Sequence, residues 1–394
     1  MKPLEGIRVV EMTTMIAAPS CGRQLAHLGA EVIKIESLTG DPYRSITTLS
    51  GGIPVIFDVL NAGKKSVAVN AKSEAVNEVL LNIFDDTDIF LSNIRTESLG
   101  RLGLSWQSLH MRNPRLIYAH FSGYGEEGPL SKLPGYDATA FFARSGLYRD
   151  FTAPENEPVN HVYGFGDMVC GLALSTNILA ALFNRRQTGM GEKIECALNQ
   201  LSAWTMLMPM VYEQFGSVLQ RERGKPVDVA NATMLCKDGE YICYNCGTEK
   251  QWKGYCHALG LDALLEDPRA RTLSDVIKHT PELLPEILPV FLKHSAEEWV
   301  EIFRTHDVPC ERHRHVAEMA SDEQLLTNGY IHPLAYSDTS VMVPAPPIRF
   351  SSDGLSRGMK AEPLGAHTEA VLKAFGCTQA CFERLKKTGD ILVT

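Results

Sequence analysis

The first 200 residues alternate short apolar runs with segments of helix length. Residues 7–12 form an apolar run, a loop of small residues and a helix-length stretch follow, and residues 31–36 form the next run. This order is typical of a βαβ unit. Further strand-like runs occupy residues 66–70, 88–91, 115–121 and 193–198. The pattern predicts an α/β fold with a Rossmann-like large domain.

The pattern changes after about residue 216. Residues 217–325 carry a strand pair near 233–245 and then helical segments, which predicts a smaller α+β domain. Residues 326–394 are expected to return to the large domain, which otherwise spans residues 1–216. A chain of 394 residues is long enough to form these two cores.

Residues 168–183 are apolar on nearly every face and rich in Ala and Leu, which predicts a buried helix. Asp167 stands at its start and follows Gly164 and Gly166. Two interpretations are open at this point. The carboxylate is either a plain N-cap, a position that Asp favours, or a reactive group that the small glycines leave accessible to a ligand.

The loop after the first strand, residues 12–18, lacks the G-x-G-x-x-G pattern of a dinucleotide site, so a nicotinamide site is not expected. Basic residues instead cluster near the predicted strand ends, where α/β sheets bind ligands. Together they predict a phosphate-binding rim made of Lys64, Lys65, Lys72, Arg95 and Arg101.

The net charge of −9 argues against a general nucleic-acid binder, which needs clustered Lys and Arg. Neither an apolar segment of signal-peptide length nor a run long enough for a bilayer is visible, so we expect a soluble, cytoplasmic protein that binds no membrane. Cys243 and Cys246 would point to opposite faces of one strand, and we expect no metal.

Several stretches, taken in order from about residue 4 to residue 376, resemble one family, the class III (CaiB/BaiF-type) CoA-transferases. The matching stretches include residues 17–21, 30–36, 40–44, 61–66, 103–105, 113–117, 123–125, 166–167, 188–192 and 363–368. So many matches in one order are far more specific than any single motif.

The resemblance implies that Asp167 is a catalytic carboxylate, which attacks an acyl-CoA thioester to form an acyl-aspartyl anhydride. It also implies an interlocked homodimer of two ring-like chains. Coenzyme A enters as the acyl-CoA substrate. Carried over position by position, the family's CoA contacts fall on Met15, Ile16, Ala17, Val69, Lys72, Asn93, Ile94, Arg95 and Arg101.

The chain also departs from some members of the family. Ser37 replaces a basic residue that stacks on adenine in some members, and Ile16 stands where formyl-CoA transferase has a glutamine. The glycine-rich loop that covers that enzyme's active site has no counterpart around residues 217–260. These departures argue against oxalate as the substrate.

Residues 135–146 and 164–167 resemble most the branch that transfers CoA to 2-hydroxy acids in amino-acid fermentation, such as phenyllactate and 2-hydroxyisocaproate. A downstream 2-hydroxyacyl-CoA dehydratase is the partner that this branch implies. Carnitine and bile-acid CoA-transferases remain alternatives. So does an α-methylacyl-CoA racemase, although Tyr136 occupies its histidine position and a phenol is a poor base near neutrality. An alternative from another class is a CoA-binding regulator without chemistry.

Overall fold

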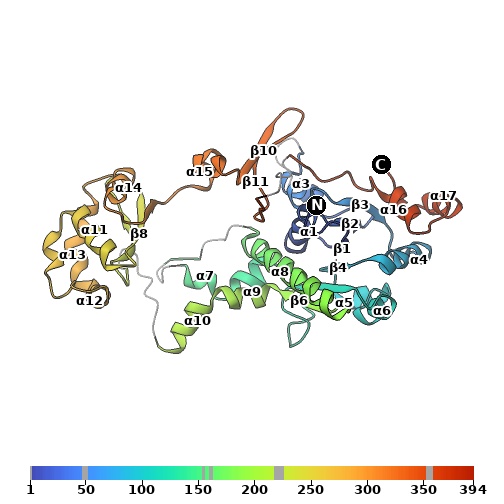
Figure 1. The fold of residues 1–394 in the computed structure, drawn as a ribbon, viewed down its shortest axis with the longest axis horizontal. Helices are drawn as coiled ribbons and strands as arrows, with labels where there is room; N and C mark the ends of the chain where they lie inside the picture. The colour runs from blue at the N-terminus through green and yellow to red at the C-terminus, as the bar shows by residue number, and fades with distance from the viewer. Residues whose placement is uncertain (1, 47–51, 153–155, 159–162, 217–225, 352–357) are drawn as a thin grey trace. The chain divides into compact units, whose positions relative to one another are not determined.

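The structure is a computed structural model that describes residues 2–46, 52–152, 156–158, 163–216, 226–351 and 358–394 (Figure 1). The chain divides into two compact units. Unit 1 comprises Met1–Ser145, His161–Met206 and Ala320–Thr394, and unit 2 comprises Gly146–Asn160 and Leu207–Met319. The predicted domain boundary at residue 216 adjoins residues 217–225, which lie outside the described residues.

Unit 1 contains a seven-stranded sheet in the order β12-β3-β2-β1-β4-β5-β6. β1 to β6 pair in parallel, in the doubly wound order 3-2-1-4-5-6, and β12 pairs antiparallel to β3. The predicted α/β class with a mostly parallel sheet is confirmed. The strands are β1 Arg8–Met12, β2 Glu31–Glu36, β3 Lys65–Val69, β4 Ile89–Ser92, β5 Ile117–Ser122, β6 Lys193–Ala197 and β12 Ile391–Leu392.

Helices cover this sheet and bury its apolar strands. α1 packs closely along α8, and α4, α16 and α17 contribute side chains to the main core of unit 1. The helices of unit 1 are α1 Ala17–His27, α2 Tyr43–Ile46, α3 Val55–Asn61, α4 Glu74–Ile83, α5 Thr96–Arg101, α6 Trp106–Arg112, α8 Phe165–Thr188, α9 Leu198–Thr205, α15 Glu323–Thr327, α16 Thr368–Ala374 and α17 Gln379–Thr388, with the short helices η1 Phe84–Asp86 and η2 Asp137–Ala143.

The C-terminal segment returns to unit 1 through β3. The hydroxyl of Thr368 accepts a hydrogen bond from the Ala68 amide at 3.0 Å, and Gly365 donates its amide to the Ser66 hydroxyl at 3.0 Å. A hairpin of β10 (Ile331–Ala335) and β11 (Ser340–Pro344) precedes this return. The sequence pattern does not predict β12, because two residues are too few to show a period.

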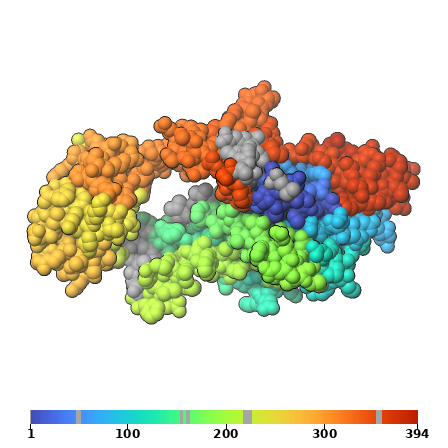
Figure 2. Space-filling view, viewed as in Figure 1, coloured from blue at the N-terminus to red at the C-terminus, as the bar shows by residue number. Residues whose placement is uncertain are grey.

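α8 differs from the buried helix that the sequence predicts. Its buried side includes Cys170, Leu174 and Ile178, whereas Phe183 is 65% exposed. Figure 2 shows the green residues of this segment at the surface. The prediction was wrong because apolar composition alone does not reveal which face lies against α1 and the sheet. Length and composition would let α8 cross a membrane, but core helices pass the same test.

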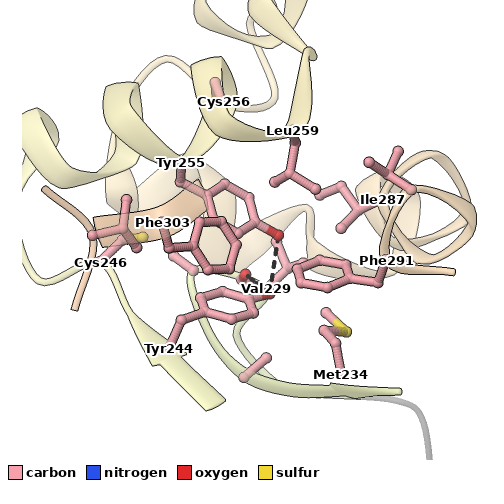
Figure 3. Close-up of a cluster of buried hydrophobic side chains, with 14 of the residues drawn as sticks. Val229, Met234, Tyr244, Cys246, Tyr255, Cys256, Leu259, Ile287, Phe291 and Phe303 are labelled. Carbon is pink, nitrogen blue, oxygen red and sulfur yellow. Dashed lines mark hydrogen bonds between the residues drawn. The ribbon is translucent and has the colours of Figure 1, made fainter. Parts of the chain in front are cut away.

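Unit 2 has its own core, built around a three-stranded antiparallel sheet. Tyr244 and Tyr255 lie among aromatic side chains in this core, and their hydroxyls are 2.9 Å apart (Figure 3). The strands are β7 Asn231–Leu235, β8 Tyr241–Asn245 and β9 Cys310–Arg312. The helices are α7 Leu147–Asp150, α10 Leu207–Gln214, α11 Glu249–Leu259, α12 Leu273–Lys278, α13 Thr280–Phe291 and α14 Ala296–Thr305, with η3 Asp262–Leu265 and, at the unit boundary, η4 Val316–Ser321.

Candidate active site

The carboxyl ends of the parallel strands share one edge of the unit 1 sheet. β1 lies between β2 and β4, so the chain crosses over in opposite directions on its two sides. Such a switch point is where open α/β sheets bind ligands. The predicted residues 15–17 follow β1 and 93–95 follow β4, so both groups flank the switch point.

Two hydrogen bonds join these loops. The Thr14 amide donates to the Asn93 side-chain oxygen at 3.1 Å, and the Asn93 side chain donates to the Thr14 carbonyl at 2.8 Å. Met15 has a φ of 72°, a left-handed conformation that is uncommon for a residue other than glycine. Its amide donates to Asp41 at 3.3 Å. The structure thus brings the loop that carries Met15 next to Asn93.

A series of polar contacts holds the backbone of Ile94. Its amide donates to the Ser92 hydroxyl at 3.1 Å, and its carbonyl lies 2.9 Å from His120 Nε2. The other ring nitrogen of His120 lies 2.7 Å from Glu126, which also pairs with Lys193. Burial acts to raise the pKa of Glu126, but hydrogen bonds from His120 and Lys193 outweigh it and lower the pKa to about 2.

Three of the predicted cations are exposed near this edge. Lys72 lies in the turn after β3, Arg95 precedes α5 and Arg101 is in the last turn of α5. The side chain of Asn77 donates to the carbonyl oxygens of Ala71 and Leu102 at 3.4 and 2.9 Å, and so ties the turn that holds Lys72 to the residue after Arg101.

Other predicted members of this rim lie elsewhere. Lys64 is only 3% exposed and donates to Glu11 at 2.9 Å, so its predicted place in the basic rim was wrong. Lys65 pairs with Glu31 at the amino end of β3. Val69 is buried in the core and pairs with Ile391 of β12, so its side chain is not available to a ligand. The sequence alone cannot distinguish a solvated lysine from one that is buried in an ion pair, because both have the same local pattern beside a strand end.

Asp167 is the third residue of α8, and Gly164 occupies the N-cap position. The plain N-cap interpretation is therefore wrong. Because Gly166 has no side chain, Asp137 and Phe141 approach the helix closely at the position before Asp167. A Cβ at position 166 would lie 2.3 Å from Asp137 Oδ1 and 2.4 Å from Phe141. Burial, and then the charge of Asp137, raise the pKa of Asp167 to about 7.

Asp167 also lies near the loop after β1. A Cβ at position 164 would lie 3.0 Å from the Ile16 side chain, and one at position 171 would lie 2.7 Å from the Ala17 carbonyl. The start of α8 therefore packs directly on the start of α1. Tyr43 lies close enough for the Asp167 charge to raise its pKa, after burial as the larger cause.

Sequence reasoning missed the roles of Asp41 and Asp137 at this site. Asp137 is 5% exposed and accepts the Gly164 amide at 2.9 Å. Both residues stand in family-like stretches, but nothing local indicates which backbone amide each would bind. Among the residues that the structure describes, no group of three or more His, Cys, Asp or Glu is placed to hold a metal.

Comparison with known proteins matches residues 4–368 to the model of CoA-transferase family III. The chain belongs to this family. It is 33% identical over 381 residues to the (R)-2-hydroxy-4-methylpentanoate CoA-transferase of Clostridioides difficile, with 95% of each chain covered. It is 32% identical to the cinnamoyl-CoA:phenyllactate CoA-transferase of Clostridium sporogenes, covering 98% of this chain and 97% of the relative.

Solved structures agree with the fold. A crystal structure of a variant of Rv3272 from Mycobacterium tuberculosis superposes with a TM-score of 0.85 at 26% identity, covering 94% of this chain and 98% of that one. The resemblance to class III CoA-transferases is thus confirmed. The protein is an enzyme that transfers CoA between an acyl-CoA and a carboxylate.

Proposed function

We propose that this CoA-transferase uses Asp167 as its nucleophile and moves CoA from an acyl-CoA donor to a 2-hydroxy acid such as phenyllactate or 2-hydroxyisocaproate. The observation that carries the proposal is the position of Asp167. Its carboxylate is partly buried at the start of α8, where that helix packs on the loop at the sheet's switch point.

In the first step, an Asp167 oxygen attacks the thioester carbonyl. The carbon–sulfur bond breaks, CoA leaves as a thiolate, and an acyl-aspartyl anhydride forms. The thiolate then attacks the aspartyl carbonyl, releases the donor acid as its carboxylate and leaves an aspartyl-CoA thioester. The acceptor carboxylate attacks this thioester, and the released thiolate attacks the acceptor side of the new anhydride. These steps yield the acceptor's CoA ester and restore Asp167.

The environment of Asp167 favours its acylation. Burial and the nearby Asp137 raise its pKa because both disfavour a negative charge at this position. Acylation removes that charge just as protonation does. The same two effects therefore favour the anhydride over the free carboxylate, and they make the ionised group a stronger nucleophile than an ordinary aspartate.

The proposed CoA contacts divide by chemistry. Lys72, Arg95 and Arg101 are exposed cations suited to the nucleotide phosphates. The loop residues 15–17 and 93–94 would hold the rest of the CoA through their backbone and apolar side chains. The two loops are hydrogen-bonded to each other at the switch point, which supports their assignment to one binding site.

The two hydroxy-acid transferases support the choice of acceptor. At about one-third identity they support the class of acid more than the particular side chain. Products of this class would pass to a 2-hydroxyacyl-CoA dehydratase in amino-acid fermentation, which is a cytoplasmic setting.

We further propose that the enzyme is a homodimer whose chains interlock. α10 supports this, because its sequence is largely apolar and none of its residues is buried within one chain. In unit 1, Trp204 on α9 is 72% exposed, which is unusual for so large an apolar side chain. A second copy of the chain would cover such surfaces.

Two experiments test the proposed function: chemical trapping of the acylated Asp167 and a survey of acceptor acids. Acyl-CoA and hydroxylamine should convert Asp167 to a hydroxamate, identified by peptide mass, and the Asp167→Ala variant should form none and show no CoA exchange. Retained turnover by that variant would refute the nucleophile. The survey offers phenyllactate, 2-hydroxyisocaproate, carnitine and bile acids as acceptors, and it supports the proposal if the hydroxy acids react fastest. Incorporation of solvent deuterium at the α-carbon without any acceptor would instead indicate a racemase.

A further inference from the structure

A cluster of charged side chains is buried beneath the loop that leads from β1 to α1. Its four central members are almost inaccessible to solvent: Glu11 is 0% exposed, Lys34 1%, Asp41 2% and Lys64 3%. Lys34 lies in the buried part of β2, and it is the register partner of Glu11 in the neighbouring strand β1.

The cluster is internally paired. Lys34 Nζ lies 3.2 Å from Glu11 and 3.2 Å from Asp41, and Lys64 Nζ lies 2.9 Å from Glu11. At the border of the cluster, Arg44 pairs with Glu36 at 2.8 Å. With this pair included, the cluster contains three cations and three carboxylates. Burying such charges is costly, and an apolar set of the same volume often stabilises a fold as well or better.

Beyond its ion pairs, Lys34 is linked to backbone groups of the loop that follows β1. Its ammonium donates to the Thr13 carbonyl at 2.8 Å, which fixes the first residue of the loop. Through Asp41 it reaches two more backbone groups, because the other Asp41 oxygen accepts the Met15 amide at 3.3 Å and the Tyr43 amide at 3.0 Å.

These backbone groups border the candidate active site. Met15 is held in its left-handed conformation, which a free loop would seldom adopt. The next residue, Ile16, packs against Gly164 just before Asp167, and Tyr43 lies within electrostatic reach of the Asp167 carboxylate. Through the loop after β1 and through Asp41, the Lys34 ammonium is thus linked to two residues near Asp167, which are Ile16 and Tyr43.

We propose that Lys34 is a positioning residue for the transferase reaction: acting through Asp41 and the Thr13 carbonyl, it holds the loop of residues 13–16 in the strained form that aligns acyl-CoA with Asp167. The inference rests on the proposed role of Asp167. Lys34 itself touches no substrate. Its removal would let Met15 relax and move Ile16 away from the reacting carbonyl.

Lys64 provides a matched control. It is equally buried and shares Glu11 with Lys34, but its other partners are the Pro19 carbonyl and Asn61, which do not belong to the loop. Lys34→Met and Lys64→Met each remove one buried ammonium and keep a similar side-chain length. Both should lower the thermal unfolding midpoint, since each leaves Glu11 with one cation fewer.

The readout is the single-turnover rate of hydroxamate formation on Asp167 at saturating acyl-CoA, measured below the unfolding range of each variant. Lys34→Met should slow it about 10- to 100-fold, as expected for a misplacement of about 1 Å, while Lys64→Met stays within about threefold of the parent. If Lys34→Met fails to fold, Asp41→Asn provides the test, because it keeps an oxygen for the Met15 amide but loses the ion pair. It should give a smaller loss in the same direction.

Equal rates in Lys34→Met and the parent, or losses in both lysine variants that simply follow their lost stability, would overturn the inference. Should Asp41→Asn be needed, a rate equal to the parent's would also overturn it. Absence of the hydroxamate in the parent enzyme would instead refute the role of Asp167. The two failures are therefore distinguishable.

Discussion

The Asp167→Asn substitution should change the way in which stability depends on pH. The native carboxyl holds its proton up to about pH 7, whereas an unfolded aspartate releases it near 3.8. Between these values the native state binds more protons than the unfolded state, so the parent's free energy of unfolding falls as pH rises. The amide that replaces the carboxyl does not titrate, so the variant lacks this decline.

The magnitude follows from the two pKa values. Each pH unit between them costs the parent up to about 1.4 kcal/mol, and over the range from about pH 5 to pH 8 the loss sums to about 2–3 kcal/mol. The variant should therefore gain about that much on the parent across this range. Both effects that raise the pKa contribute, burial more than Asp137.

Urea unfolding of both proteins at fixed protein concentration and ionic strength measures this difference at each pH. Asp137→Asn is the matched control, because it keeps Asp167 buried but removes the neighbouring charge. The parent's decline should shrink in that background without disappearing. A difference between Asp167→Asn and the parent that stays constant from about pH 5 to pH 8 would show that Asp167 titrates as an ordinary carboxyl, and the reasoning on its reactivity would fail with it.

Three further outcomes are expected. Gly166→Ala should destabilise the protein by about 1–3 kcal/mol in chemical denaturation and sharply slow CoA exchange, since its Cβ would overlap Asp137 and Phe141; normal stability and turnover would contradict the close packing. Arg95→Ala should raise the KM for acyl-CoA about tenfold in steady-state kinetics at low salt, with little change in kcat. The reason is that a hydrogen bond to a charged group contributes about 1.5–3 kcal/mol. An unchanged KM would show that Arg95 does not bind the phosphates. Trp204→Lys should lower the thermal unfolding midpoint of the dimer, because interlocked chains separate only on unfolding and the substitution places a charge where the second copy would cover an apolar side chain; a parent enzyme that sediments as a monomer in analytical ultracentrifugation would contradict the proposed assembly.

The alternation of apolar runs and helix-length segments was sufficient to predict the α/β class and the strands β1 to β6. Such patterns are local, since the side-chain period of a strand or helix is set by its own backbone. The short strand β12 escaped prediction because its two residues pair only with a distant part of the chain, β3.

The candidate site was predictable only in part. The order of family-like motifs pointed to Asp167 and to the loops after β1 and β4, and the structure places these loops together. Asp137 could not be assigned a role, because its hydrogen bond to Gly164 spans 27 residues of sequence. No local rule specifies such a contact.

Sequence by itself determined which segments become strands and helices, the family, and the residue types available for chemistry. Only the tertiary structure decided which charges are buried, which face of α8 is covered and what surrounds Asp167. The physical reason is that burial and pairing depend on neighbours brought in by folding. Lys64 and Lys72 look alike along the chain, yet one is buried beside Glu11 and the other is exposed at the edge of the proposed CoA site.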